Sequence, residues 1–459
     1  MRTLMAILAL SALSGCATLI EPLPAPVSPP AGWRGAPVAE TPAVAPWWKA
    51  FGDTTLDALV DEALQQNTDV RQAAARVAQA RALVASARAE QQPSVGVGLG
   101  ANRRRYPAQR YPGFPEPVPA ATFNEVAGGI EAAYEIDLFG RLAKGVARAQ
   151  DEQRATEWDL RAARLAVARD VVAAYADARI AEARLSEIRQ LAATAAALRA
   201  TEGRLVRAGL GTTRDARDAD DLAAAAALSA AKLERTHAVA IARLGVLLDQ
   251  APVDVKMGAP SDDTFAAPLR VSVDLPASVI ERRPDVQAAW QRLSGATTDI
   301  ERVRLERYPR LRLTGALGFA SNELHTWLTR NALAWAIGAA ASMPLLDGGR
   351  IDARSAGAVA VRDQYAAAYR RAVVVALGEV EEALAAWQAA SVELDAQTDA
   401  LARRARDRHE AVRAVALGRS GARDRLRDEV AVLRTQDALL AAQFERIAAY
   451  AAIQHALAQ

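Results

Sequence analysis

Few residues in this chain have a type and spacing that could support catalysis or metal binding. The only cysteine is Cys16, and the four histidines are scattered: His237, His325, His409 and His455. No two of these residues have helical or loop ligand spacing. The run Gly96-x-Gly98-x-Gly100 alternates with apolar residues and lacks the Lys-Ser/Thr of a phosphate-binding loop. Without paired carboxylates or a nucleophile–base set, the sequence predicts no catalytic residue, no metal site, no cofactor and no enzyme.

Charge and composition also exclude several kinds of partner and fold. The 459 residues carry 56 Lys+Arg and 54 Asp+Glu, a net charge of +2, which provides no field to attract nucleic acid. One cysteine excludes a disulfide scaffold. Aromatic residues are only 5%, and long stretches are dominated by Ala, Arg, Leu, Glu and Asp. This composition favours long helices with narrow contact seams over thick globular cores.

The N-terminus has the features of a secretory signal peptide. A basic opening precedes the apolar run Leu4–Leu13, which is too short to cross a bilayer of about 30 Å. The segment Leu13-Ser14-Gly15-Cys16 resembles the bacterial lipobox, which implies removal of residues 1–15 and a covalent lipid on Cys16. The alternative is an ordinary cleavage site with an incidental cysteine. We expect residues 16–52 to consist of an acylated cysteine followed by a proline-rich, extended tether.

The rest of the chain contains an internal sequence repeat with two copies. Asp69–Val77 aligns with Asp285–Leu293, 216 residues later, and Pro93 aligns with Pro309 at the same shift. Gly140, Gly209 and Asp215 align with Gly349, Gly418 and Asp424 at a shift of 209. We therefore expect a first repeat at 53–248, an inter-repeat equatorial segment at 249–283, and a second repeat at 284–459. For each repeat, the pattern predicts a helix, two strands, a very long helix and a final helix, in that order.

Four segments of about ten residues have one apolar face, at about 94–103, 124–138, 310–320 and 332–343. Their length matches tilted membrane strands, whereas a soluble half-buried sheet is the alternative. The second face carries acidic residues, and we expect Glu131, Glu135 and Asp137 to line a barrel lumen. Four strands cannot close a barrel, so spanning strands require an oligomer.

Two proline-free stretches, 141–207 and 350–417, have apolar and alanine residues at helical spacing. Each predicts a helix of roughly 100 Å at 1.5 Å per residue. Such a helix must pack in a coiled-coil-like array to cover its apolar stripe. Glycines at 209, 211, 418 and 421 predict the turns that end these helices.

Together these features resemble the TolC-type outer-membrane efflux factors, in particular the lipoprotein branch that serves resistance-nodulation-division (RND) pumps. The resemblance covers nearly the whole mature chain. It is carried by Trp47-Trp48-x-x-Phe51-x-Asp53-x-x-Leu56, Ala63-Leu64-x-x-Asn67, Glu135–Arg141, Leu275-Pro276, Arg282–Val286, Tyr308-Pro309 and Pro344–Arg350.

The resemblance implies a mainly α fold with a membrane β-barrel. It implies a homotrimer whose twelve-stranded barrel, four strands per chain, continues as a long periplasmic α-helical barrel. The chain would be lipid-anchored in the outer membrane of a Gram-negative bacterium, with a periplasmic membrane-fusion adaptor and an inner-membrane RND-type transporter as partners. It would conduct small molecules passively. Residues 106–119 and 321–330 would be outward-facing loops.

The resemblance also assigns candidate sites. The adaptor-docking tip turns map onto Gly209, Leu210 and Gly211, and onto Gly418, Arg419 and Ser420. Asp407, Glu410 and Arg413 are candidates for the periplasmic gate, although Val412 stands where the family pattern predicts an acidic constriction residue. The alternative for these three is a solvated helical charge face.

Two other functions remain open from the sequence. The same fold serves as the outer-membrane exit of type I protein secretion systems. A periplasmic coiled-coil scaffold would explain the helices but not the four amphipathic strands.

Overall fold

The computed structural model describes residues 22, 28–33, 46–108, 120–258, 269, 271 and 276–458. It divides into two compact units, and the four strands belong to the unit that holds Val77–Ala155 and Ala289–Ala368. The other unit holds Pro26–Arg76, Thr156–Ala288 and Tyr369–Gln459.

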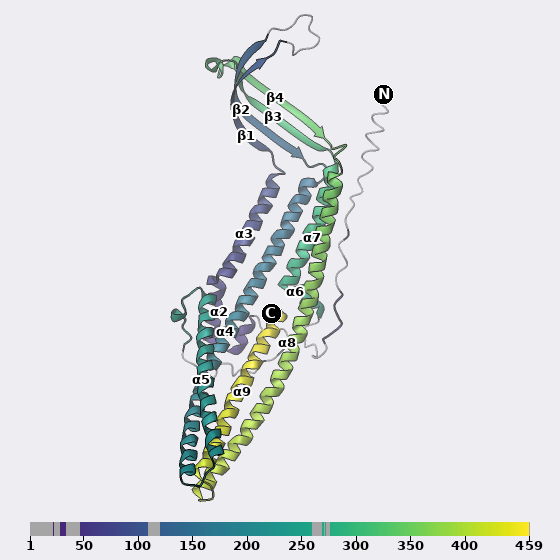
Figure 1. Ribbon diagram of the computed structural model, residues 1–459. Coiled ribbons are helices and arrows are strands. Elements are labelled where there is room, and N and C mark those ends of the chain that lie inside the picture. The colour runs from purple at the N-terminus through teal and green to yellow at the C-terminus, as the bar shows by residue number, and fades with distance from the viewer. Residues whose placement is uncertain are drawn as a thin grey trace. The chain divides into compact units, whose positions relative to one another are not determined.

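The order of elements confirms the predicted repeat (Figure 1). The first copy runs α3 (Thr68–Ala89), β1 (Ser94–Tyr106), β2 (Ala121–Ile136), α4 (Arg141–Arg207) and α5 (Thr213–Leu248). The second runs α7 (Pro284–Arg304), β3 (Arg310–Ser321), β4 (Leu333–Ser342), α8 (Arg350–Ala416) and α9 (Ala422–Ala456). Two shorter helices, α2 (Thr54–Gln66) and α6 (Pro276–Arg282), precede the copies. No described helix is long and apolar enough to cross a membrane.

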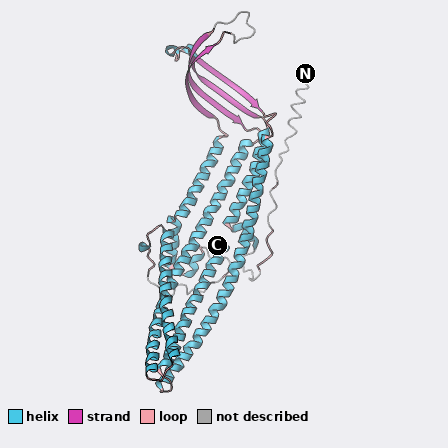
Figure 2. Cartoon of the chain, viewed as in Figure 1, coloured by secondary structure: helices cyan, strands magenta, loops and turns pink. Residues whose placement is uncertain are grey.

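The four strands, magenta in Figure 2, form one antiparallel sheet in the order β1-β2-β3-β4, as labelled in Figure 1. β1 and β2 extend further toward their connecting loop than the sequence predicted, because the ladder continues to the pair Tyr106↔Ala121. β2 ends at Ile136, two residues earlier than expected. Among the described residues, β1 and β4 each have one neighbouring strand only, which leaves both outer edges of the sheet open there.

The register places most large apolar side chains of the four strands on one face, whereas Phe123 and Tyr106, near the loop end of β2 and β1, lie on the other. Paired residues share a face, as in the row Val97↔Ile130↔Leu317↔Trp335. These side chains are exposed: Val97 by 76%, Trp335 by 71% and Ile337 by 83%. The opposite face carries mainly Gly, Ala, Thr and charged residues. Within the part of the chain that the structure describes, this face is therefore an apolar surface largely exposed to solvent.

A row of small residues crosses the sheet on the opposite face: Gly98↔Gly129↔Gly318↔Ala334. The backbones of β2 and β3 approach closely here. A Cβ on Gly129 would lie 2.5 Å from the carbonyl oxygen of Leu317, and a Cβ on Gly318 would lie 2.6 Å from the Cα of Gly129. Only glycine fits such contacts, which are typical of bends in barrel strands.

Helices α4 and α7 meet along a polar seam in the sheet-bearing unit. Lys144 pairs with Glu301, and the Arg148 Nε lies 3.5 Å from Asp299 Oδ1. Further along, the Ser294 hydroxyl donates to Asp151 at 3.3 Å. Beside it, a Cβ on Gly295 would lie 3.2 Å from the Cβ of Asp151. The glycine allows the two helices to come together at this point.

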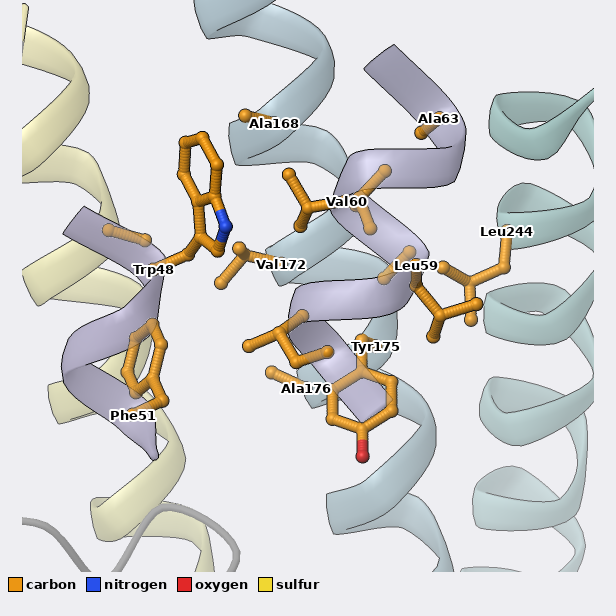
Figure 3. Close-up of a cluster of buried hydrophobic side chains, with 14 of the residues drawn as sticks. Trp48, Phe51, Leu59, Val60, Ala63, Ala168, Val172, Tyr175, Ala176 and Leu244 are labelled. Atoms are coloured by element: carbon orange, nitrogen blue, oxygen red, sulfur yellow. The ribbon is translucent and has the colours of Figure 1, made fainter. Parts of the chain in front are cut away.

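The core of the other unit is built around α2 (Figure 3). Leu59 and Val60 of α2 lie between Val172 and Tyr175 of α4 on one side and Leu244 of α5 on the other. The 3₁₀ turn Trp47–Phe51 buries all three of its aromatic rings, and Trp47 and Phe51 also contact Tyr450 of α9. The aromatic part of the Trp-Trp-x-x-Phe-x-Asp motif is therefore core.

Asp53, the last residue of that motif, has two roles. Its Oδ1 accepts hydrogen bonds from the backbone of Thr55 at 2.8 Å and Leu56 at 3.1 Å, which caps α2. Its Oδ2 accepts a hydrogen bond from the Tyr175 hydroxyl at 2.7 Å. Burial and this bond raise the pKa of Tyr175 to about 12. Asp53 thus fixes the start of α2 against α4.

The described part of the predicted tether is not simply an extended strap. Trp33 is buried against Val279, Val380 and Ile453. The segment that contains it therefore contributes a side chain to the core between α6, α8 and α9. Cys16 and residues 1–15 lie outside the described residues.

Candidate functional site

The three residues predicted for a barrel lumen have different environments. Glu131 lies on the small-residue face, between Gly96 and Ala316 in the register, and is exposed. Glu135 is on the same face and opposite Arg312, and its Oε1 accepts a hydrogen bond from the Arg141 Nη2 at 2.7 Å. These two carboxylates occupy the positions that the alternation predicted.

Asp137 requires a correction, because the structure places it after β2 and not in it. Its two carboxylate oxygens accept from the backbone of Leu142 at 3.1 Å and of Ala143 at 2.8 Å. Asp137 therefore caps α4. Asp347 does the same for α8, accepting from Gly349 at 3.0 Å and Ile351 at 2.9 Å. The period-two pattern could not separate a capping residue from one more strand position.

The two tip turns have the same backbone geometry. Leu210 N donates to Leu205 O at 2.8 Å and Gly209 N donates to Val206 O at 3.1 Å. In the second copy, Arg419 N donates to Ala414 O at 2.8 Å and Gly418 N donates to Val415 O at 3.0 Å. Gly209 and Gly418 have φ values of 69° and 68°. Both turns are Schellman motifs with glycine at the left-handed position.

Side chains around the two turns differ in exposure and in polar contacts. Leu210 is 74% exposed and Gly211 packs its backbone against Leu205. Thr212 caps α5 by accepting from Asp215 N at 3.1 Å. In the second turn, the Ser420 hydroxyl donates to Asp424 Oδ2 at 2.7 Å, and this hydrogen bond is the main cause that lowers the pKa of Asp424.

Arg427 of α9 joins the two helical hairpins, a role that the sequence did not predict. Its Nη2 lies 2.9 Å from Glu202 Oε1 on α4 and 3.0 Å from Asp215 Oδ1 on α5. Glu202 is fully buried, whereas Asp215 and Arg427 are partly exposed. The sequence gives no sign of these contacts, because Arg427 lies 212 residues from Asp215 and 225 residues from Glu202.

The gate candidates Asp407, Glu410 and Arg413 all lie on α8 and are exposed. Asp407 pairs with Arg404 of its own helix at 3.6 Å. Asp407 also lies near Asp428 of α9. Burial raises the pKa of Asp428, and the negative charges of Asp407 and Asp424 raise it further. Asp428 is therefore an additional acidic residue at this level, and the sequence analysis missed it. The gate assignment itself stays a prediction.

The Arg-Arg-Pro-Asp segment contains a buried charged residue. Arg283, whose side chain is 6% exposed, pairs with Asp285 and Glu379 at 2.6 Å each. Its Nη1 donates to the carbonyl oxygen of Ala456 at 3.1 Å. One guanidinium thus ties the start of α7 to α8 and to the end of α9. Next to it, burial and then the charges of Arg169 and Arg283 lower the pKa of His455.

We expect Arg283→Leu to lower the free energy of unfolding by about 3 kcal/mol, because it breaks a buried ion-pair cluster and leaves the Ala456 carbonyl without its donor. Thermal unfolding of the detergent-solubilised protein measures the change. The matched control is Arg282→Leu, because Arg282 is exposed and bonds within α6 to Ser278.

The dependence of thermal stability on pH, in the acid range, gives a second measurement of this role. Burial alone would raise the pKa of Asp285, but the hydrogen bonds and charge of Arg283 outweigh it and hold the pKa below its usual value. The stability that this pair contributes is present above a pH of about 4 and is lost as the pH falls through the lowered pKa. Equal Tm losses in Arg282→Leu and Arg283→Leu, with the same acid dependence, would contradict the assigned role.

Among the described residues, no group of three or more His, Cys, Asp and Glu side chains is placed to hold a metal ion. The notable surfaces are instead an exposed apolar sheet face with open edges and two glycine turns at the ends of 67-residue helices. This combination is typical of a membrane channel protein that also has long helices.

The comparison with known proteins agrees. The family model "Outer membrane efflux protein" matches residues 59–249 and 275–459. The chain belongs to this family of outer-membrane efflux channels.

Its relatives include OprJ, an outer membrane protein of Pseudomonas aeruginosa, which is 31% identical over 353 residues, 74% of this chain and 70% of the relative. The toluene efflux pump outer membrane protein TtgF of Pseudomonas putida is 29% identical, with 84% of this chain and 82% of the relative covered.

Solved structures of channels share the fold. The outer-membrane channel OprN superimposes with a TM-score of 0.85 at 27% identity, covering 96% of this chain and 99% of that one. The open state of the MtrE outer membrane channel of Neisseria gonorrhoeae has a TM-score of 0.79 at 27% identity, covering 95% and 98%.

Proposed function

We propose that three copies of this chain form the exit duct of a three-part efflux system. β4 of each copy pairs with β1 of the next, so the sheets close into a twelve-stranded barrel in the outer membrane. The observation that carries this proposal is the four-stranded sheet with one exposed apolar face and two open edges. In lipid, unpaired backbone groups cost several kcal/mol each, so the edges require partners.

In this proposal the duct is passive, and an inner-membrane pump of the RND type delivers small molecules to it through a periplasmic adaptor. The relatives' names support small-molecule export, since TtgF is described as part of a toluene efflux pump and OpmQ of P. aeruginosa as a pyoverdine export protein. The two turns that end the long helices dock the adaptor. Their shared Schellman geometry supports equivalent roles.

Lipid attachment at Cys16 is part of the proposal and rests on the lipobox-like sequence alone. One acyl chain binds membranes weakly. The barrel supplies the second membrane contact.

Conductance tests the proposal. The purified protein, reconstituted into planar bilayers, is expected to give discrete conductance steps, whereas a periplasmic scaffold gives none. Ile337→Arg should prevent insertion, because a cation on the lipid face near the bilayer centre costs about 2–4 kcal/mol per chain.

The matched control is the neighbouring change Ala336→Arg. Ala336 lies on the opposite face of β4, which would face the water-filled interior of the proposed barrel. This variant should still insert. If both arginine variants insert equally well, the apolar face does not contact lipid and the proposed barrel is wrong.

A further inference from the structure

The apolar face of the sheet ends abruptly on β1. Along that face the pairs are Val97↔Ile130, Leu99↔Gly128 and Ala101↔Val126, followed by Arg103↔Asn124 and Arg105↔Thr122. Because alternate residues share a face, the two arginines continue the same surface as the valine and leucine. Arg103 lies four residues beyond Leu99, roughly 13 Å along the strand.

An aromatic side chain marks the same boundary. The Trp327 Nε1 donates to the carbonyl oxygen of Phe319 at 2.9 Å. A Cβ on Gly128 would lie 2.5 Å from the Trp327 ring. The ring therefore packs on the apolar face, one side-chain row from Ala101. Indole rings with a satisfied N–H are typical of the interface between hydrocarbon and headgroups.

Arg103 and Arg105 are exposed and, within the described part of the chain, form no ion pair or side-chain hydrogen bond. Their paired neighbours Asn124 and Thr122 are neutral. Arg104, between them, points to the other face, where its Nη1 donates to the Tyr106 hydroxyl at 3.4 Å and interacts electrostatically with Glu125. Two positive charges therefore lie directly beyond an apolar band and an indole ring, with no compensating charge among the described residues.

We propose that Arg103 and Arg105 bind the phosphate groups of an acylated, phosphorylated lipid in the outer leaflet. The order along this face is apolar band, indole, guanidinium pair, which matches the order of acyl chain, interface and phosphate in such a lipid. A guanidinium binds phosphate through two parallel hydrogen bonds, a stronger contact than a neutral donor makes. The inference rests on the proposed insertion of the sheet and adds the lipid class that its outer rim recognises.

The test compares lipid A, which carries two phosphates, with its dephosphorylated form, using native mass spectrometry of the detergent-solubilised protein. The double variant Arg103→Gln/Arg105→Gln should bind lipid A at least about tenfold more weakly than the wild type. Arg104→Gln is the matched control, because it removes the same kind of charge from the opposite face of the same strand. It should bind lipid A as the wild type does.

Three outcomes would overturn the inference: equal weakening in Arg104→Gln, no weakening in the double variant, or equal binding of dephosphorylated lipid A. Displacement of lipid A by inorganic phosphate alone would also overturn it, because the site would then recognise a free anion and not a lipid. Planar-bilayer conductance of the same samples keeps the two proposals apart. Absence of conductance in the wild type contradicts the channel, whereas normal conductance with unselective lipid binding contradicts only this site.

Discussion

Gly318→Ala is expected to abolish the assembled protein in the outer membrane. The added methyl group would overlap the carbonyl oxygen of Gly128 and lie 2.6 Å from the Cα of Gly129, both backbone atoms of the paired strand. Backbone cannot move aside as a flexible side chain can, so the pairing of β2 with β3 must break or shift. A shift by one residue would move every apolar side chain of β3 to the wrong face. Heat-resistant oligomer in isolated outer membranes measures the loss.

Gly315→Ala is the matched control for this prediction. Gly315 also lies in the middle of β3, but a Cβ there meets no atom within 4 Å. This variant should assemble at the wild-type level. Normal assembly of Gly318→Ala would show that the two central strands do not approach as closely as described, and the bend of the sheet would need another cause.

The double variant Gly209→Val/Gly418→Val is expected to remove efflux while the protein stays assembled. Both glycines have left-handed backbone, with φ values of 69° and 68°, which a β-branched residue adopts only with strain. The strain would change the shape of both tip turns, which we propose as the adaptor-docking surface. The 67-residue helices and the sheet have their own contacts and should persist. Drug susceptibility of cells that depend on this channel measures the effect.

Gly209→Asn/Gly418→Asn tests whether backbone shape is responsible. Asparagine tolerates the left-handed conformation, so this variant should retain most of the efflux. If the valine variant pumps normally, the turns do not dock the adaptor. If the asparagine variant fails as completely as the valine variant, the loss comes from side-chain size and not from backbone geometry.

The sequence predicted the architecture well because its signals are periodic and repeated. Two constant shifts, 216 and 209, revealed the duplication, and strict alternation located the four strands to within about three residues of their observed ends. The glycines of the tip turns were identifiable because each ends a long proline-free stretch. Patterns of this kind depend on local geometry, which a single sequence records directly.

Contacts between distant segments could not be predicted in the same way. Arg283 belongs to a recognised motif, yet its partners Glu379 and Ala456 are fixed only by how α7, α8 and α9 pack. The close approach of Gly129 and Gly318 depends on the β2–β3 register, and Trp33 looked like part of a solvated tether. Asp137 was misplaced because a helix-capping aspartate continues the same odd-numbered series as Glu131 and Glu135.

Because the edges of β1 and β4 are unpaired among the described residues, membrane insertion of the sheet should depend on the concentration of chains. A chain that meets no other copy keeps two rows of free amide and carbonyl groups, so its sheet has no stable state of its own in hydrocarbon. In the proposed trimer, the free energy that holds the sheet together depends on protomer concentration, as it does for any obligate oligomer. Refolding yield should consequently rise with chain concentration before aggregation intervenes, and a chain that has not yet met another copy should need protection of its apolar face.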